Sequence, residues 1–221
     1  MSLAGRQLLR ARRLSAVAMG VLAWLIMSFA WSGEPTEDLD YFRIPAGRAP
    51  VTEKIEILEF FYYGCGACNR YEPHAQAWLT FLPADVTYRR IPALRRQEWI
   101  PLARVFFALE SLNELDRLHA EVYRGIHDHE MNLADSSQLF KWAGQNGLER
   151  ERLKKALDAE TLDEKIQRAR DATVLYSIRT TPTIVVDGRY LTSSSMAGSA
   201  DTLVLVVDAL VRKAREDRTR P

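Results

Sequence analysis

The stretch KIEILEFFYYGCGAC, residues 54–68, decides the fold. Its first ten residues are rich in β-branched and aromatic side chains and become almost continuously apolar, which is typical of a strand buried on both faces. Gly64 ends this run, and apolar residues at helical spacing follow from Cys65 onward. The sequence therefore predicts a central strand that leads directly into a helix, with two cysteines at the junction.

The segments on either side of this stretch complete a βαβ unit. Residues 86–92, VTYRRIP, alternate apolar and polar side chains and predict a second strand. Since a helix separates the two strands, they are expected to run parallel. Residues 41–45 predict a short edge strand before the unit.

A long helical block interrupts the pattern of strands. No strand signal occurs between about residues 98 and 160, where apolar residues recur at helical spacing. We expect one helix over residues 100–126 and two shorter helices after it, separated at Asn146-Gly147. The order of elements is therefore a βαβ unit, a block of helices, and a second half that begins with a helix over residues 162–176.

The second half closes with a hairpin and a helix. In TPTIVVDGRYLT, the pair Asp187-Gly188 is the composition of a two-residue hairpin with a type I′ turn. A final amphipathic helix is expected to start at a cap formed by Ser199 or Asp201. An antiparallel hairpin beside a parallel pair indicates a mixed α/β sheet.

The N-terminus is basic and then apolar. Four arginines and no acid lie within residues 1–30, and residues 14–31 form an uncharged apolar run. This is the layout of a secretory signal, with Ala30 or Ser32 as candidate cleavage positions. The run is long for a signal core and short for a comfortable membrane span, so a cleaved signal and an uncleaved anchor both stay open. In either case we expect the body to be exported.

The composition and charge of the chain are those of a soluble globular protein once the N-terminal segment is set aside. Hydrophobic residues make up 47% of the 221 and charged residues 27%, which is the profile of a globular protein. The formal net charge is +1, and without the N-terminal arginines the rest carries about −3. This mildly acidic body gives no reason to expect nucleic-acid binding.

Cys65 and Cys68 are the only cysteines of the chain. A disulfide between them would add little to the stability of the fold, because the stabilisation by a disulfide grows with the length of the loop that it closes. A zinc site needs about four ligands, and none of the four histidines has zinc-finger spacing to the cysteines, so no metal is expected. His127 and His129 are expected to be solvated. Redox chemistry in an oxidising compartment is the favoured interpretation.

The position of each cysteine predicts its role. Cys65 lies where the strand ends and the helix begins, so the free N–H groups and the dipole of the helix stabilise its thiolate. Cys65 is therefore expected to be the exposed nucleophile. Cys68, one turn later, is expected to be the more buried partner that closes the disulfide or resolves a mixed disulfide.

Glu59 is the one acid in the apolar half of the central strand. A carboxylate there costs several kcal/mol of desolvation unless it is paired or protonated. Under one interpretation it is a buried acid that exchanges protons with Cys68 and tunes the thiol pKa values. Under the other, it reaches the sheet edge or pairs with Arg89 or Arg90.

Over roughly residues 39–214 the sequence resembles the DsbA-type thiol:disulfide oxidoreductases of the thioredoxin superfamily. The resemblance rests on EFFYYGCGAC, on the helical block, and on RTTPTIVVDGRY. It implies an α/β thioredoxin fold with an inserted all-helical domain. The expected parts are a signal or anchor (1–32), the first part of the thioredoxin-like domain (33–97), the helical insertion (98–160), the second part (161–216) and a tail (217–221).

The resemblance also assigns the site. It implies that Cys65 and Cys68 form a redox-active disulfide that needs no dissociable cofactor, and that Glu59 is the buried acid. It further implies that the bond between Thr181 and Pro182 is cis and packs beside the disulfide. The substrate-binding residues are then expected to be Thr181, Pro182, Gly66 and Ala67.

Partners and location follow from the family as well. The expected substrates are unfolded or partly folded exported proteins, and a DsbB-like membrane quinone reductase is expected to reoxidise the enzyme. The protein is expected to be periplasmic, either soluble after signal cleavage or tethered to the inner membrane by residues 14–31. A monomer is expected, because the sequence has no stem or coiled coil for dimerisation.

One departure from the family concerns the dipeptide Gly66-Ala67. Strongly oxidising relatives usually have a histidine next to the second cysteine, and alanine cannot supply its partial charge or its hydrogen bond. The disulfide should therefore be a weaker oxidant. A disulfide donor is the first expectation and a reductase or isomerase is the alternative. A membrane-tethered binding or chaperone module is the alternative of another class, and it would need no exposed thiol of low pKa.

Overall fold

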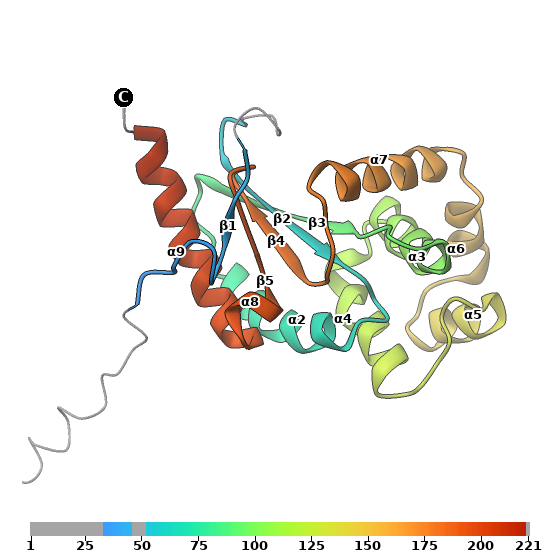
Figure 1. Ribbon diagram of the computed structural model, residues 1–221. Coiled ribbons are helices and arrows are strands. Elements are labelled where there is room, and N and C mark those ends of the chain that lie inside the picture. Colours follow the sequence, from blue (N-terminus) through green and yellow to red (C-terminus); the bar gives the residue numbers. More distant parts are fainter. Residues whose placement is uncertain (1–32, 46–51, 220–221) are drawn as a thin grey trace, which may run out of the picture. The chain divides into compact units, whose positions relative to one another are not determined.

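A five-stranded mixed sheet lies at the centre of the computed structural model, which describes residues 33–45 and 52–219 (Figure 1). The strand order is β1-β5-β4-β2-β3, and β2 runs parallel to β3 while the other neighbours are antiparallel. The strands are β1 (Phe42–Arg43), β2 (Ile55–Phe61), β3 (Val86–Pro92), β4 (Thr183–Val186) and β5 (Tyr190–Ser193). The βαβ unit, the edge strand and the hairpin are therefore confirmed.

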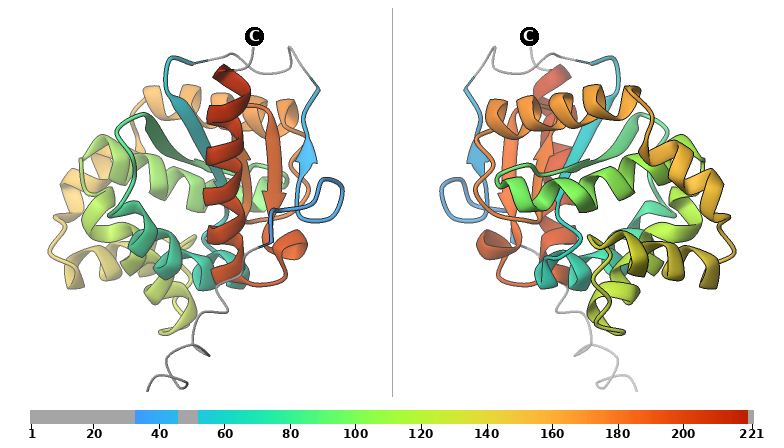
Figure 2. Two further views of the ribbon diagram at one scale, coloured as in Figure 1. Left: turned by 90° about the vertical axis from the view of Figure 1, so that its left-hand side faces the viewer. Right: turned by 90° about the vertical axis from the view of Figure 1, so that its right-hand side faces the viewer.

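Helices cover both faces of this sheet. They are α2 (Gly66–Leu79), the short 3₁₀ helix η1 (Gln97–Trp99), α3 (Ile100–Ser111), α4 (Leu115–His127), α5 (Ser136–Gln145), α6 (Arg150–Leu157), α7 (Thr161–Leu175), α8 (Ser194–Ala197) and α9 (Ala200–Thr219). Figure 2 shows α9 and α2 in front of the sheet in one view, and α3 and α7 in front of it in the opposite view. The sheet is thus the middle of three layers, and α3–α6 form the helical insertion.

The strand β2 explains why two helical layers are needed. Its side chains pack into two apolar cores, since Ile57 packs with the α9 side and Leu58 packs with the insertion side. Both residues are buried, as is Phe60. A strand that is apolar on both faces can be buried only between two layers, which is the pattern predicted from the sequence.

Two predictions of local structure were wrong in detail. The helix expected over residues 100–126 is two helices, because Asn113 adopts a left-handed conformation with φ 56° between them. Asparagine tolerates this conformation better than most residues. The hairpin turn has positive φ at Asp187 and Gly188, as a type I′ turn requires, but Val186 pairs with Tyr190, so three residues connect the strands.

Arg189 is the additional residue of that connection. Its N–H donates a hydrogen bond to the carbonyl oxygen of Val186 at 3.0 Å, which closes the turn around Asp187 and Gly188, and its carbonyl oxygen accepts one from the N–H of Ile44 at 2.7 Å. At the start of α9, the hydroxyl of Ser199 accepts from the N–H of Thr202, so Ser199 is the cap. No helix within the described ranges is both long enough and apolar enough to span a bilayer. The expected signal or anchor segment, residues 1–32, lies outside the described residues.

Candidate active site

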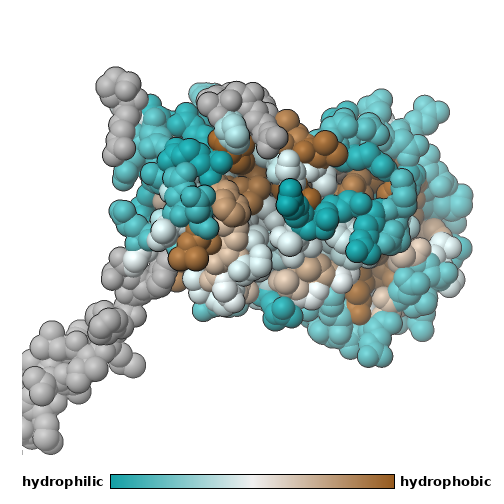
Figure 3. All heavy atoms as spheres, viewed as in Figure 1, coloured by the Kyte–Doolittle hydropathy of each residue, from teal (hydrophilic) through white to brown (hydrophobic). Residues whose placement is uncertain are grey.

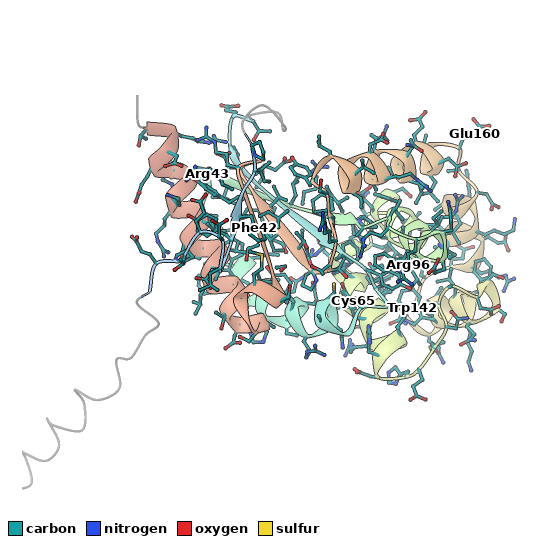
Figure 4. The ribbon with its side chains drawn as sticks, in the orientation of Figure 1. Phe42, Arg43, Cys65, Arg96, Trp142 and Glu160 are labelled. Carbon is teal, nitrogen blue, oxygen red and sulfur yellow. The ribbon has the colours of Figure 1, made fainter. Side chains whose placement is uncertain are left out.

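The two cysteines lie where β2 leads into α2, and Figure 4 labels Cys65 at this junction. The carbonyl of Cys65 accepts the first hydrogen bond of the helix, from the N–H of Asn69 at 3.0 Å, so Cys65 is the N-cap residue. Cys65 is half-buried, whereas Cys68 is completely buried. Both are free thiols in this structure.

The surroundings move the two thiol pKa values in opposite directions. The pKa of Cys65 is lowered to about 5, chiefly by a hydrogen bond with Cys68 and also by backbone N–H groups of Cys68 and Ala67, and these outweigh its partial burial. Burial and the neighbouring sulfur of Cys65 raise the pKa of Cys68 well above its ordinary value. The first thiol is therefore a thiolate at neutral pH and the second is not.

The segment before β4 closes over the nucleophile. The bond between Thr181 and Pro182 is cis, as the family resemblance implies. Sγ of Cys65 lies 3.2 Å from the carbonyl oxygen of Thr181, within reach of a hydrogen bond when the thiol is protonated. The CxxC motif and this loop thus form one site, although they are far apart in the sequence.

Glu59 lies in β2 with its side chain under the active-site helix. It is completely buried, and its Oε2 accepts hydrogen bonds from the hydroxyl of Tyr88 at 2.7 Å and from Nε of Arg90 at 3.2 Å. Its Oε1 has no hydrogen-bond partner among the described residues. Burial raises the pKa of Glu59 to about 7 even though Arg90 opposes the shift.

The structure bears on both interpretations of Glu59. The carboxylate is buried and does not reach the sheet edge, and it pairs with Arg90. Arg89 binds Glu56 instead. The negative charge of Glu59 is among the causes that raise the pKa of Cys68, so the two groups interact electrostatically.

A series of buried polar side chains, not predicted from the sequence, extends from Glu59 into the helical insertion. Arg90 pairs with both Glu59 and Glu72, and Glu72 in turn contacts Nε2 of His119 on α4 at 3.4 Å. Nδ1 of His119 lies 2.8 Å from the hydroxyl of Tyr63. Burial lowers the pKa of His119, and the pKa of Glu72 is also low because His119 and Arg90 outweigh the effect of its burial.

One further histidine contact corrects an expectation. His127 is not simply solvated, because its Nε2 lies 2.8 Å from the carbonyl oxygen of Tyr63, two residues before Cys65. Its partner lies 64 residues away in the sequence, so local pattern could not indicate it. The described ranges contain no cluster of three or more His, Cys, Asp or Glu side chains arranged for a metal ion.

An aromatic pair stands next to the nucleophile. The ring of Tyr62 stacks on Trp99 of η1, with 4.3 Å between ring centroids and 5° between planes. A Cβ on Gly64 would lie only 2.6 Å from this tyrosine ring. Glycine at position 64 therefore allows Tyr62 to fold back over the backbone just before Cys65.

A groove of about 860 Å³ adjoins the site on the side of α8. Three residues of the expected substrate-binding set line it, namely Ala67, Thr181 and Pro182. Gly66 is the first residue of α2 and is not among the lining residues. A reactive dithiol at the end of a sheet strand, facing a cis-proline loop and an open groove, is the arrangement of a thiol:disulfide oxidoreductase with a thioredoxin fold.

Comparison with known proteins agrees with this class. The model of the DSBA-like thioredoxin domain family matches residues 84–210. A thiol:disulfide interchange protein DsbA from Azotobacter vinelandii is 28% identical over 207 residues, which cover 91% of this chain and 96% of that protein. Its counterpart from Bordetella parapertussis is 33% identical over 164 residues, covering 74% and 78%. The crystal structure of Pseudomonas aeruginosa DsbA superposes with a TM-score of 0.78 at 29% identity, covering 84% and 97%.

These matches establish the family. The chain belongs to the DSBA-like thioredoxin domain family and is a thiol:disulfide oxidoreductase.

Proposed function

We propose that the protein is a disulfide donor that oxidises cysteine pairs in unfolded or partly folded exported proteins. One observation carries this proposal: Cys65 is half-exposed with a pKa of about 5, whereas Cys68 is completely buried with a raised pKa. A thiolate of low pKa stabilises the reduced form of the enzyme, and this makes its disulfide an oxidant. It also makes Cys65 a good leaving group when a mixed disulfide is resolved.

The reaction has two exchange steps. A substrate thiolate attacks the sulfur of Cys65, the bond between Cys65 and Cys68 breaks, and a mixed disulfide forms while Cys68 takes the electron pair. A second substrate thiolate then attacks the substrate sulfur of the mixed disulfide and releases Cys65 as a thiolate. The substrate loses two electrons and the enzyme disulfide is reduced to the dithiol, so no dissociable cofactor is needed.

Glu59 is proposed to supply the proton that Cys68 needs as it leaves. A buried thiolate of high pKa is a poor leaving group, so protonation lowers the cost of its departure. A carboxyl group with a pKa of about 7 can both give and accept a proton near neutral pH. Oε1 of Glu59, which has no hydrogen-bond partner among the described residues, is proposed to take part in this transfer. Thr181, Pro182 and Ala67 are proposed to hold the substrate chain in the groove.

The cycle requires a partner that reoxidises the dithiol, and a DsbB-like membrane quinone reductase is proposed for this role. The periplasm is the proposed compartment, with residues 1–32 acting as a cleaved signal or an inner-membrane anchor. The proposed domain boundaries remain those predicted from the sequence, with residues 98–160 as the insertion between 33–97 and 161–216. The protein is proposed to act as a monomer and to bind no nucleic acid.

The alternative of a reductase or isomerase rests on one residue. Ala67 cannot donate a hydrogen bond from its side chain to the thiolate, so the reduced form lacks a stabilising contact that a histidine would add. The binding-module alternative is less well supported, because a disulfide with a merely structural role needs no thiol of low pKa at a half-exposed position.

The test is stoichiometric oxidation of a reduced peptide that carries two cysteines. The oxidised protein should convert the peptide to its disulfide form within minutes, while the Cys65→Ser variant should leave it reduced. If the oxidised protein leaves the peptide reduced and the dithiol form instead reduces insulin disulfides efficiently, the direction proposed here is wrong. Activity in neither assay would favour the binding module.

A further inference from the structure

The groove beside Cys65 has an unusual charge. Twelve residues line it, and none of them is acidic. Arg70 is the only one with a permanent charge, and His74 is the only other titratable group. Hydroxyl side chains make up much of the rest: Thr180, Thr181, Ser194, Ser195 and Ser199. The groove is therefore polar and cationic, and an uncharged substrate segment would leave its one full charge unpaired.

Arg70 stands close to the reacting sulfur. It is exposed on α2, five residues after Cys65, and its Nη1 lies 3.5 Å from the position that a Cβ on Gly66 would occupy. The guanidinium group thus lies beside the dipeptide that separates the two cysteines. A substrate bonded to the sulfur of Cys65 has to pass near this cation, because the adjoining groove is lined by the same arginine.

Within residues 33–45 and 52–219, no acidic side chain neutralises Arg70. The structure shows no ion pair or hydrogen bond from its guanidinium group to any described residue, and it differs in this from Arg90 on the same side of the sheet. The positions three and four residues away along α2 hold glycine, alanine, proline and histidine, so the helix offers no carboxylate partner. Asp201, at the start of α9, accepts a hydrogen bond from Ser199 and interacts electrostatically with His74, but it does not line the groove and forms no ion pair with Arg70 in the described residues.

A second polar group in the groove also lacks a partner. Oγ of Ser194 is buried and makes no hydrogen bond to the described residues. Buried hydroxyl groups without a partner are uncommon, because each forfeits the hydrogen bonds it would make to water. A polypeptide in the groove can supply a backbone carbonyl or N–H for this hydroxyl, while a carboxylate side chain pairs with Arg70.

We propose that Arg70 makes this enzyme selective for substrate cysteines that have an aspartate or glutamate within a few residues in the chain. The inference rests on the proposed function, since it concerns which thiols reach Cys65. An exposed ion pair of this kind is worth about 0.2 to 1 kcal/mol, or up to about fivefold in rate. The effect should weaken as the salt concentration rises.

The test uses three reduced peptides with two cysteines each, identical except for Glu, Gln or Lys two residues from the first cysteine. Second-order rates of oxidation are measured with the oxidised full chain, with Arg70→Gln and with Arg70→Glu. Lys155→Glu is the matched control, because it reverses a charge at an exposed site on α6, outside the groove. Each rate is divided by the Arg70→Gln rate for the same peptide, which removes differences in intrinsic thiol reactivity.

For the unsubstituted protein, the oxidation rate relative to that of Arg70→Gln should be about threefold higher for the Glu peptide than for the Lys peptide. Arg70→Glu should reverse this order and Lys155→Glu should preserve it. The same divided rate for all three peptides would overturn the selectivity and leave the oxidase function standing. If the parent fails to oxidise even the Gln peptide, the proposed function fails first, so the two failures are distinguishable.

Discussion

Sγ of Cys65 lies 3.2 Å from the carbonyl oxygen of Thr181, across 116 residues of sequence. The first residue comes from the junction of β2 and α2, and the second from the loop before β4. The pairing of β2 with β4 brings these two segments together at the same end of the sheet. A substrate sulfur that approaches Cys65 is therefore bounded by the Thr181 loop, and the site depends on the whole sheet.

The two cysteines should fail in different ways when they are replaced. Cys68→Ser keeps the nucleophile and removes the resolving thiol, so it should accumulate a covalent mixed disulfide with a substrate cysteine. Cys65→Ser should form no such adduct, because Cys68 is completely buried. Non-reducing electrophoresis after incubation with an activated disulfide peptide distinguishes the two. Adducts on Cys68 in the Cys65→Ser variant would contradict the assignment of the nucleophile.

The alkylation rate of reduced Cys65 should follow a titration with a midpoint near pH 5. Its thiolate predominates above that pH and reacts, while the thiol below it does not. Because the largest cause of the low pKa is the hydrogen bond with Cys68, Cys68→Ala should move the midpoint upward, toward the ordinary thiol value of about 8.5. Ultraviolet absorbance of the thiolate measures both midpoints. An unchanged midpoint in the variant would show that the helix terminus alone lowers the pKa.

The same shift predicts how the stability of the reduced protein depends on pH. The folded pKa of Cys65 lies below that of an unfolded thiol, so the thiolate favours the folded state. This contribution is fully present above about pH 8.5 and is lost as the pH falls to about 5. Cys65→Ala should flatten that part of the curve in urea unfolding. If the unfolding free energy of the variant depended on pH just as steeply, the dependence would come from other groups.

Glu59 should make the stability of the folded protein depend on pH in the opposite direction to Cys65. Its folded pKa is raised to about 7, so the protonated carboxyl favours the folded state, and this contribution is present below the unfolded pKa of about 4.3 and is lost as the pH rises through about 7. The difference in unfolding free energy between Glu59→Gln and the parent should therefore shift in favour of glutamine by on the order of 2.5 kcal/mol between pH 5 and pH 8. Urea unfolding of the reduced proteins at both pH values measures it. A constant difference would mean that Arg90 keeps Glu59 ionised at both.

Two buried tyrosines near His119 differ in whether the hydroxyl group has a partner. The hydroxyl of Tyr63 contacts His119, whereas the hydroxyl of Tyr123 has no partner among the described residues, and both rings are buried. Tyr63→Phe leaves Nδ1 of His119 unpaired and should lower the free energy of unfolding by about 1 to 3 kcal/mol. Tyr123→Phe should be close to neutral or stabilising. Equal losses in the two variants would show that the contact with His119 contributes nothing.

Much of this fold follows from local patterns. The continuous apolar run in residues 54–63 predicts a strand that is buried on both faces, and the alternation in residues 86–92 predicts its parallel neighbour. Both can be predicted because successive side chains of a strand point to opposite faces of the sheet, so the sequence shows which faces are buried. The break at Asn113 was missed, since apolar spacing continues through it and only the backbone conformation changes. Similarly, the local sequence pattern does not show that Val186 pairs with Tyr190, which leaves three residues in the hairpin connection.

Some residues of the site could likewise be predicted from local sequence patterns, and others could not. The cysteines and Glu59 could be found from the sequence, because a CxxC motif at a strand end and a lone acid in an apolar strand are local anomalies. The chain from Arg90 through Glu72 to His119 could not, because it joins a strand, the active-site helix and the insertion. One signal was present: Glu72 and His119 both lie on faces of their helices that are otherwise apolar and buried.

The most direct test of the central claim is the equilibrium between the Cys65–Cys68 disulfide and a glutathione buffer, measured on the exported body. A thiol pKa of about 5 lies between about 3.5 for DsbA and about 7 for thioredoxin. We therefore expect a reduction potential between about −120 and −270 mV, with Ala67→His shifting it toward the oxidising end. A potential at or below that of thioredoxin would contradict a disulfide donor, and a pair that never exchanges with glutathione would contradict the account as a whole.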